Sequence, residues 1–238
     1  MEKFKHLHLW MILPLLIIQL GIFNYYWPGF SSKSWEIHIH YWLVSAWYLF
    51  LILQAHFLTK NKLSKHRTWG IFGFLLAGGV IFSAISLLDF PLKLAAQANP
   101  EAGGPPVFFY YATLIAEFFS IIAFAYAISQ AIIHRKNLQE HAWWLIASVF
   151  YMMVPALGRG MILFWRTILN PEDFSPLYVF TSTELIYLFL FLFFAYKFGK
   201  LKHPASWIGL GLIAIRFISK PLAANESVQD FLQSLIKY

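Results

Sequence analysis

Long apolar stretches separated by short polar connections run along the whole chain. A helix needs about 20 mostly apolar residues to cross the hydrocarbon core of a bilayer. Six stretches meet this requirement, namely Leu9–Trp27, Ile37–Leu58, Thr68–Leu88, Val107–Ile133, Ala142–Phe164 and Leu177–Tyr196. A seventh, Pro204–Ile218, is shorter and contains two glycines and an arginine. The pattern predicts an all-α bundle of seven transmembrane helices, with six as the alternative, and one domain over residues 1–238.

Two further segments are expected outside these helices. The longest connection, residues 89–106, contains Asn-Pro and Gly-Gly-Pro-Pro, which predicts an ordered loop over the outer face of the membrane. Residues 225–238 place apolar side chains such as Phe231 and Leu235 at helical spacing, opposite polar ones. This pattern is typical of an amphipathic helix that lies in the membrane interface.

Lysine and arginine are distributed unequally between the two sets of connections. One set holds most of them and includes Lys62 and Lys65, whereas the other set holds Lys33, Lys93 and Arg166. Because cytoplasmic connections carry the excess of positive charge, we expect the N-terminus to be cytoplasmic. The expected location is the bacterial inner membrane.

The composition supports a lipid-solvated chain and excludes several classes of protein. Hydrophobic residues make up 59% of the chain and charged residues 12%, whereas soluble proteins contain about 25% charged residues. Most of the lysines and arginines behind the net charge of +7 lie in the connections between apolar segments, as expected for a membrane protein, so no nucleic-acid partner is expected. The absence of cysteine excludes disulfides and thiolate chemistry. The expected partners are the lipid bilayer and, as further candidates, other membrane subunits.

Several ionisable residues lie inside the predicted helices, in the half expected to face outward. At 1.5 Å of rise per residue, His40 lies about 5 Å deep, Arg159 about 9 Å, Glu184 about 10 Å and Glu117 about 15 Å. Arg216 lies near the outer end of the last helix. Because charges are costly in lipid, we expect Glu117, Arg159 and Glu184 to converge. They would form either an ion-pair network or an outward-facing pocket for a metal or small ligand.

The second predicted helix carries further candidate residues. His38 and His40, with nearby carboxylates, form a donor set for a divalent metal such as Zn²⁺. Residues two apart on a helix point about 200° apart, so both histidines reach one ion only where the helix is frayed. Trp47 and Gln54 follow His40 at intervals of seven. These three side chains share a helix face, which indicates either a ligand-lining stripe or packing between helices.

Haem is the second candidate cofactor. His66 and His141 match in predicted depth on the cytoplasmic side, and a transmembrane haem needs two histidines at matching depth on facing helices. Both residues, however, precede the predicted helices and lie at the level of the lipid headgroups. The alternative for them is contact with lipid phosphate and helix ends.

At these residues the sequence resembles a widespread family of bacterial inner-membrane proteins without assigned function. The shared features are His38-Ile-His40 with Trp47 and Gln54, His66-Arg67 followed by Gly70, Glu117, His141 before the Pro155–Arg159 stretch, Glu184 and His203-Pro204. The resemblance implies a seven-helix fold whose second helix starts with His-x-His. The family usually carries Asp at the positions of Glu117 and Glu184, and more often a basic residue at the position of Ala142. It implies a topology and a shortlist of residues, and no reaction.

Three functions are therefore expected. The first is a membrane-embedded binding protein or enzyme whose pocket residues are Glu117, Arg159, Glu184, Trp47 and Gln54, with His38 and His40 as metal ligands. The second is a haem-carrying electron-transfer protein, and the third is a structural or assembly subunit of a membrane complex. No phosphate-binding loop and no Ser-His-Asp grouping is present, so hydrolase and nucleotide chemistry have no support.

Overall fold

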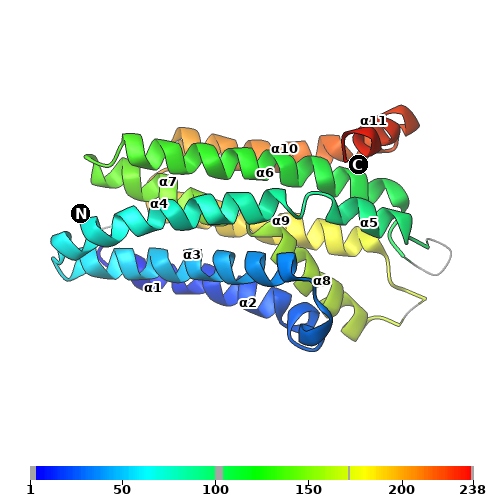
Figure 1. The fold of residues 1–238 in the computed structure, drawn as a ribbon, viewed down its shortest axis with the longest axis horizontal. Helices are drawn as coiled ribbons and strands as arrows, with labels where there is room; N and C mark the ends of the chain where they lie inside the picture. Colours follow the sequence, from blue (N-terminus) through cyan, green and yellow to red (C-terminus); the bar gives the residue numbers. More distant parts are fainter. Residues whose placement is uncertain (1–3, 100–103, 171, 237–238) are drawn as a thin grey trace.

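All regular structure in the described part of the chain is helical. The computed structural model describes residues 4–99, 104–170 and 172–236 (Figure 1). Its helices are α1 (Leu7–Trp10), α2 (Ile12–Tyr26), α3 (Trp35–Thr59), α4 (Leu63–Ile85), α5 (Phe90–Ala96), α6 (Val107–Ile133), α7 (Leu138–Tyr151), α8 (Val154–Ile168), α9 (Pro176–Lys197), α10 (Pro204–Ala223) and α11 (Glu226–Ile236), with a 3₁₀ turn at Phe30–Ser32. The all-α prediction is confirmed.

In the described part of the chain, six helical segments are long and apolar enough to cross a membrane. They are Leu7–Tyr26, Trp35–Thr59, Leu63–Ala96, Val107–Ile133, Pro176–Lys197 and Pro204–Ala223. Helices α7 and α8 form a seventh span if the bent pair is counted as one. The chain is therefore a multi-pass membrane protein, and the predicted seven segments, with six as the alternative, are confirmed.

The break between α7 and α8 has a local cause. The two helices meet at an angle of 41°, and Pro155 occupies the first turn of α8. Proline has no backbone N–H, so it cannot continue the hydrogen-bond ladder of α7. The amides of Met153 and Ala156 instead bond three residues back, at 3.0 and 3.1 Å. The bend lets α8 diverge from the bundle, as the yellow-green helix in Figure 1 shows.

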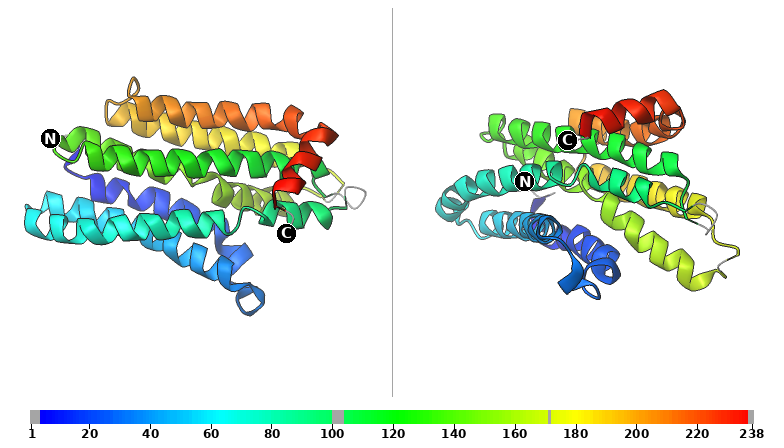
Figure 2. Two further views of the ribbon diagram at one scale, coloured as in Figure 1. Left: turned by 45° about the horizontal axis from the view of Figure 1, so that its top comes forward. Right: turned by 45° about the vertical axis from the view of Figure 1, so that its right-hand side comes forward.

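The two segments predicted outside the spans contain helices. Within residues 89–106, Phe90–Ala96 forms α5, which belongs to the candidate span Leu63–Ala96, and residues 100–103 lie outside the described part. Within residues 225–238, Glu226–Ile236 forms α11, which lies across the end of the bundle near α6 and α10 (Figure 2). Its Leu232 packs with Tyr111 of α6 and Ala223 of α10.

The bundle is held together around α7, whose apolar side chains are almost all buried. Trp143 and Phe150 are fully buried and contact Phe191 of α9. The hydroxyl of Tyr48 in α3 donates to the carbonyl of Val149 at 2.7 Å, and Tyr151 donates to a carbonyl of α10 at 2.6 Å. Large apolar side chains such as those of α4 remain exposed on the outside, where a bilayer would solvate them.

Candidate functional site

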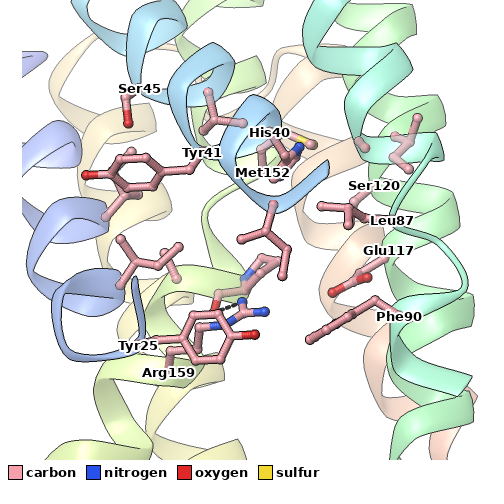
Figure 3. A pocket seen from close by; sticks show the side chains of 18 of the residues that line it. Tyr25, His40, Tyr41, Ser45, Leu87, Phe90, Glu117, Ser120, Met152 and Arg159 are labelled. Carbon is pink, nitrogen blue, oxygen red and sulfur yellow. Dashed lines mark hydrogen bonds between the residues drawn. The ribbon is translucent and has the colours of Figure 1, made fainter. Parts of the chain in front are cut away.

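One cavity of about 140 Å³ lies between α2, α3, α6 and α8, near the end of the bundle that carries α5 (Figure 3). Most of its wall is apolar, with isoleucine side chains from α2, α3 and α6. Six side chains with ionisable groups also line it, and three of them are tyrosines: Tyr25, Tyr41, Tyr151, His40, Glu117 and Arg159. We call this space the Arg159 cavity.

Arg159 enters the cavity from α8, one turn after Pro155. Its Nη1 donates to the Pro155 carbonyl of its own helix at 2.9 Å. Its guanidinium lies over the Tyr25 ring, 4.7 Å from the centroid. Within the described ranges, no carboxylate lies close enough to Arg159 to form an ion pair. The guanidinium therefore keeps N–H donors for a partner in the cavity.

Glu117 approaches the same cavity from α6, across from Arg159, as Figure 3 shows. No hydrogen bond or ion pair from the residues that the structure describes reaches its carboxylate. It lies within electrostatic range of both Arg159 and Arg216. A cation and an anion thus face one cavity from different helices without pairing.

His40 adds an imidazole to the wall of the Arg159 cavity. Its Nδ1 lies 3.1 Å from the Ser83 hydroxyl, and that hydroxyl donates to the Val80 carbonyl at 3.0 Å. Since the hydroxyl proton is used by Val80, the Nδ1–H of His40 donates to Ser83. The Nε2 of a neutral His40 then remains a hydrogen-bond acceptor.

The structure does not bring His38 and His40 to one point. His38 Nδ1 lies 2.7 Å from the Tyr26 hydroxyl, and its ring packs 4.5 Å from that of Phe30. Only His40 of the two lines the Arg159 cavity. Among the described residues, no group of three His, Cys, Asp or Glu side chains is placed to hold a metal.

Glu184 lies outside the Arg159 cavity. Its Oε1 accepts from Lys220 of α10 at 3.3 Å, and its Oε2 is buried without a hydrogen-bond partner in the described structure. Arg216 lies within electrostatic range of both Glu184 and Glu117. The structure therefore places Glu117 and Arg159 together and puts Glu184 in a neighbouring cluster, connected to them through Arg216.

The three side chains of the predicted stripe on the second helix do not line one cavity. Trp47 is 3% exposed, and its ring packs 5.6 Å from that of Phe124. Gln54, two turns further along α3, lines a second cavity of about 40 Å³ together with His66 and His141. Trp47 lines neither cavity.

Six polar residues of the Arg159 cavity were not among the candidates from the sequence, and three of them form a chain of hydrogen bonds. Tyr41 donates to the Gln19 side chain at 2.6 Å, and Gln19 donates to Ser45 at 2.9 Å. A glutamine in an otherwise apolar span is a usable signal, because polar side chains in membranes bond across helices. This chain of hydrogen bonds joins α2 to α3 along the cavity wall.

The predicted starts of two helices are wrong, and the error changes the position of two histidines. α4 begins at Leu63 rather than Thr68, and α7 begins at Leu138 rather than Ala142. Asn137 caps α7 by accepting from the amides of the second and third helical residues, a signal present in the sequence. His66 and His141 consequently lie within helical first turns, with ring centroids 6.2 Å apart.

No family model matches this chain, and no curated protein and no solved structure matches it. The fold defines the class, a helical membrane protein with six or seven candidate spans. The family that the sequence resembles is not identified by these comparisons.

Proposed function

We propose that the chain binds a small zwitterionic molecule with an apolar body in the Arg159 cavity. The observation that carries this proposal is the arrangement of Arg159 and Glu117. Both charges line one cavity, and among the described residues neither has an ion-pair partner. Leaving a buried charge without its partner costs about 3–5 kcal/mol, so a ligand that supplies both opposite charges gains binding free energy at each end.

The chemistry of the lining selects among ligand classes. A guanidinium binds a carboxylate through two parallel hydrogen bonds, and the Glu117 carboxylate is suited to an ammonium group. A simple carboxylic acid would place a second anion beside Glu117, and a simple amine would place a second cation beside Arg159. The apolar wall accepts a hydrocarbon side chain.

The size of the cavity limits the ligand. Pockets for drug-sized ligands measure about 300–1,000 Å³, whereas the Arg159 cavity measures about 140 Å³. A molecule the size of one apolar amino acid suits this volume. From the distribution of lysine and arginine, we infer that this end of the bundle faces outward across the inner membrane of a bacterium.

Leucine and two matched analogues test the proposal. Leucinamide lacks the carboxylate, and 4-methylpentanoate lacks the ammonium group. We expect leucine to raise the melting temperature of the purified protein in detergent and to bind in a calorimetric titration. Each analogue should bind about tenfold more weakly or worse, since a charged hydrogen bond contributes about 1.5–3 kcal/mol.

Substitutions of the two charged residues test which side chains bind leucine. Arg159→Gln and Glu117→Gln should each weaken leucine binding by about tenfold or more. Arg166→Gln is the matched control, because Arg166 lies on the same helix as Arg159 and contacts the Phe174 ring instead. The affinity of this variant for leucine should equal that of the wild type. The proposal fails if no apolar amino acid binds, or if 4-methylpentanoate binds as tightly as leucine.

The other functions expected from the sequence have less support. A haem between His66 and His141 would need far more than the 40 Å³ cavity there, because cofactor pockets measure about 300–1,000 Å³. A metal shared by His38 and His40 has little support, because only His40 of the two lines the Arg159 cavity. A role as an assembly subunit and membership of the resembled family stay predictions.

A further inference from the structure

The second cavity lies at the opposite end of the bundle from the Arg159 cavity, where α1, α3, α4 and α7 meet (Figure 1). Its lining is apolar except for the side chains of Met11, Gln54, His66 and His141. We propose that this space, the His66 cavity, binds one copper(I) ion through His66, His141 and Met11.

The two imidazoles have a separation suited to one shared ion. Metal–nitrogen bonds are about 2 Å long, so two imidazoles on opposite sides of an ion place their ring centroids about 6 Å apart. The rings of His66 and His141 lie 6.2 Å apart and perpendicular. The separation matches near-linear coordination, which is a geometry available to copper(I).

The protonation of His141 favours metal binding. Its Nδ1 lies 2.7 Å from the carbonyl oxygen of Ala131, so the proton is on Nδ1 and the Nε2 lone pair is available. A backbone carbonyl that orients an imidazole in this way is common behind metal-binding histidines. The Nδ1 of His66 is buried without a hydrogen-bond partner among the described residues.

The third donor selects the metal. Met11 lines the same cavity and is 2% exposed, and soft thioether ligands favour copper(I) over zinc. Gln54 is 5% exposed, and both polar atoms of its amide are buried without a partner in the described structure. Its oxygen is therefore available as a weak further ligand.

Charge gives a second reason for a monovalent ion. Among the described residues, no carboxylate or thiolate lines the His66 cavity, so these donors do not neutralise the ion. The cost of moving an ion into a low-dielectric region follows its Born energy, which rises with the square of the charge. A monovalent ion with neutral ligands therefore pays about a quarter of the desolvation cost of a divalent ion.

Another histidine pair lies at the same end of the bundle and serves as the control. The rings of His8 and His56 lie 5.5 Å apart, but neither residue lines the His66 cavity. His56→Ala should therefore leave copper binding unchanged.

Anaerobic titration of the purified protein tests the site, with copper(I) supplied from its bicinchoninate complex. We expect one equivalent to bind, and X-ray absorption to show two imidazole nitrogens and one sulfur. His66→Ala, His141→Ala and Met11→Leu should each weaken binding by about tenfold or more, or 1.4 kcal/mol. Met161→Leu is the matched methionine control, because Met161 lies on α8 and lines neither cavity.

Three results would overturn the copper site. The first is copper binding no greater than that of detergent alone. The second is a loss of copper binding in His56→Ala while His66→Ala still binds copper as the wild type does. The third is displacement of the copper by equimolar Zn²⁺. Melting curves of the metal-free variants separate loss of the site from loss of the fold. Met11→Leu is informative here, because swaps between leucine and methionine usually cost less than about 1.5 kcal/mol.

Discussion

Arg159 and Glu117 differ from Glu184 in how their charges are satisfied. Glu184 has Lys220 at 3.3 Å, whereas the Arg159 guanidinium has one hydrogen bond to its own helix and the face of Tyr25. A cation over an aromatic ring gains about 0.5–2 kcal/mol, which is less than the cost of an unpaired buried charge. The residual cost is the physical basis for a ligand at this position.

His203 shows how a single protonation step can affect the fold. Its Nδ1 accepts the amide of Ala205 at 3.1 Å and so caps α10, while Nε2 donates to Glu140 at 2.6 Å. Glu140 also accepts from Lys200. Burial lowers the pKa of His203, although the nearby Glu140 carboxylate opposes this shift. The neutral ring is the form that can accept the capping hydrogen bond.

We therefore expect acid to destabilise the protein through His203. Because its folded-state pKa lies below the unfolded value of about 6.5, its contribution is complete above pH 6.5 and is lost as the pH falls through the folded-state pKa. Asparagine caps helices without titrating, so His203→Asn should remove this part of the pH dependence, while His203→Ala should cost about 1 kcal/mol at pH 8. Melting temperatures from pH 8 to pH 4 measure both effects. Equal slopes for wild type and His203→Asn would assign the titration to other groups.

At the scale of helices, the contact between α2 and α8 shapes the Arg159 cavity. A Cβ atom added at Gly21 would lie 2.3 Å from the carbonyl oxygen of Ala156. The same addition at Gly160 would lie 3.0 Å from the Cα atom of Gly21. Small residues at membrane helix contacts allow this close approach of backbones. The approach holds Tyr25 of α2 against Arg159 of α8.

Gly21→Ala should force α2 and α8 apart, because a carbonyl oxygen of the backbone cannot move as a side chain can. We expect a loss of about 1–3 kcal/mol in stability, seen as a lower melting temperature, together with weaker leucine binding. Gly78→Ala is the control, since nothing lies within 4 Å of its added Cβ atom. It should be neutral or stabilising by up to about 1 kcal/mol. Equal effects of both substitutions would contradict this account of the contact.

At the scale of the whole molecule, the two cavities lie at opposite ends of one bundle and face different environments. α5, with Lys93, lies at the end of the Arg159 cavity, whereas α4 starts beside Lys62 at the end of the His66 cavity. The end with Lys62 carries the greater density of lysine and arginine in its connections. The positive-inside rule therefore predicts that the Arg159 cavity opens outward and the His66 cavity lies on the cytoplasmic side.

Lysine labelling tests this orientation. An impermeant amine-reactive reagent added to intact cells should label Lys93, whose side chain is 66% exposed, and should leave Lys62 and Lys65 unmodified. Permeabilised cells should show labelling of all three by peptide mass spectrometry. Labelling of Lys62 in intact cells with protection of Lys93 would show the opposite orientation, with the His66 cavity outside and the Arg159 cavity on the cytoplasmic side.

The sequence by itself determined the class of protein and the positions of its spans. Each span is a local requirement, since about 20 apolar residues must replace water along one helix, and this requirement can be evaluated without knowing the neighbouring helices. The first turns of α4 and α7 are helical but mostly polar. Because the spans were located by their apolar residues, the predicted helices begin four or five residues too late. Asn137, read as a cap, would have corrected one of them.

Only the tertiary structure decided which polar residues meet. Glu117 shares a cavity with Arg159 and not with Glu184, and His66 meets His141 beside Met11. These contacts depend on the rotation and crossing of helices, which are set by packing among residues far apart in the chain. The bend at Pro155 and the backbone contact at Gly21 fix the position of α8. Apolar periodicity carries no information on either, because lipid accepts any apolar face that a helix presents.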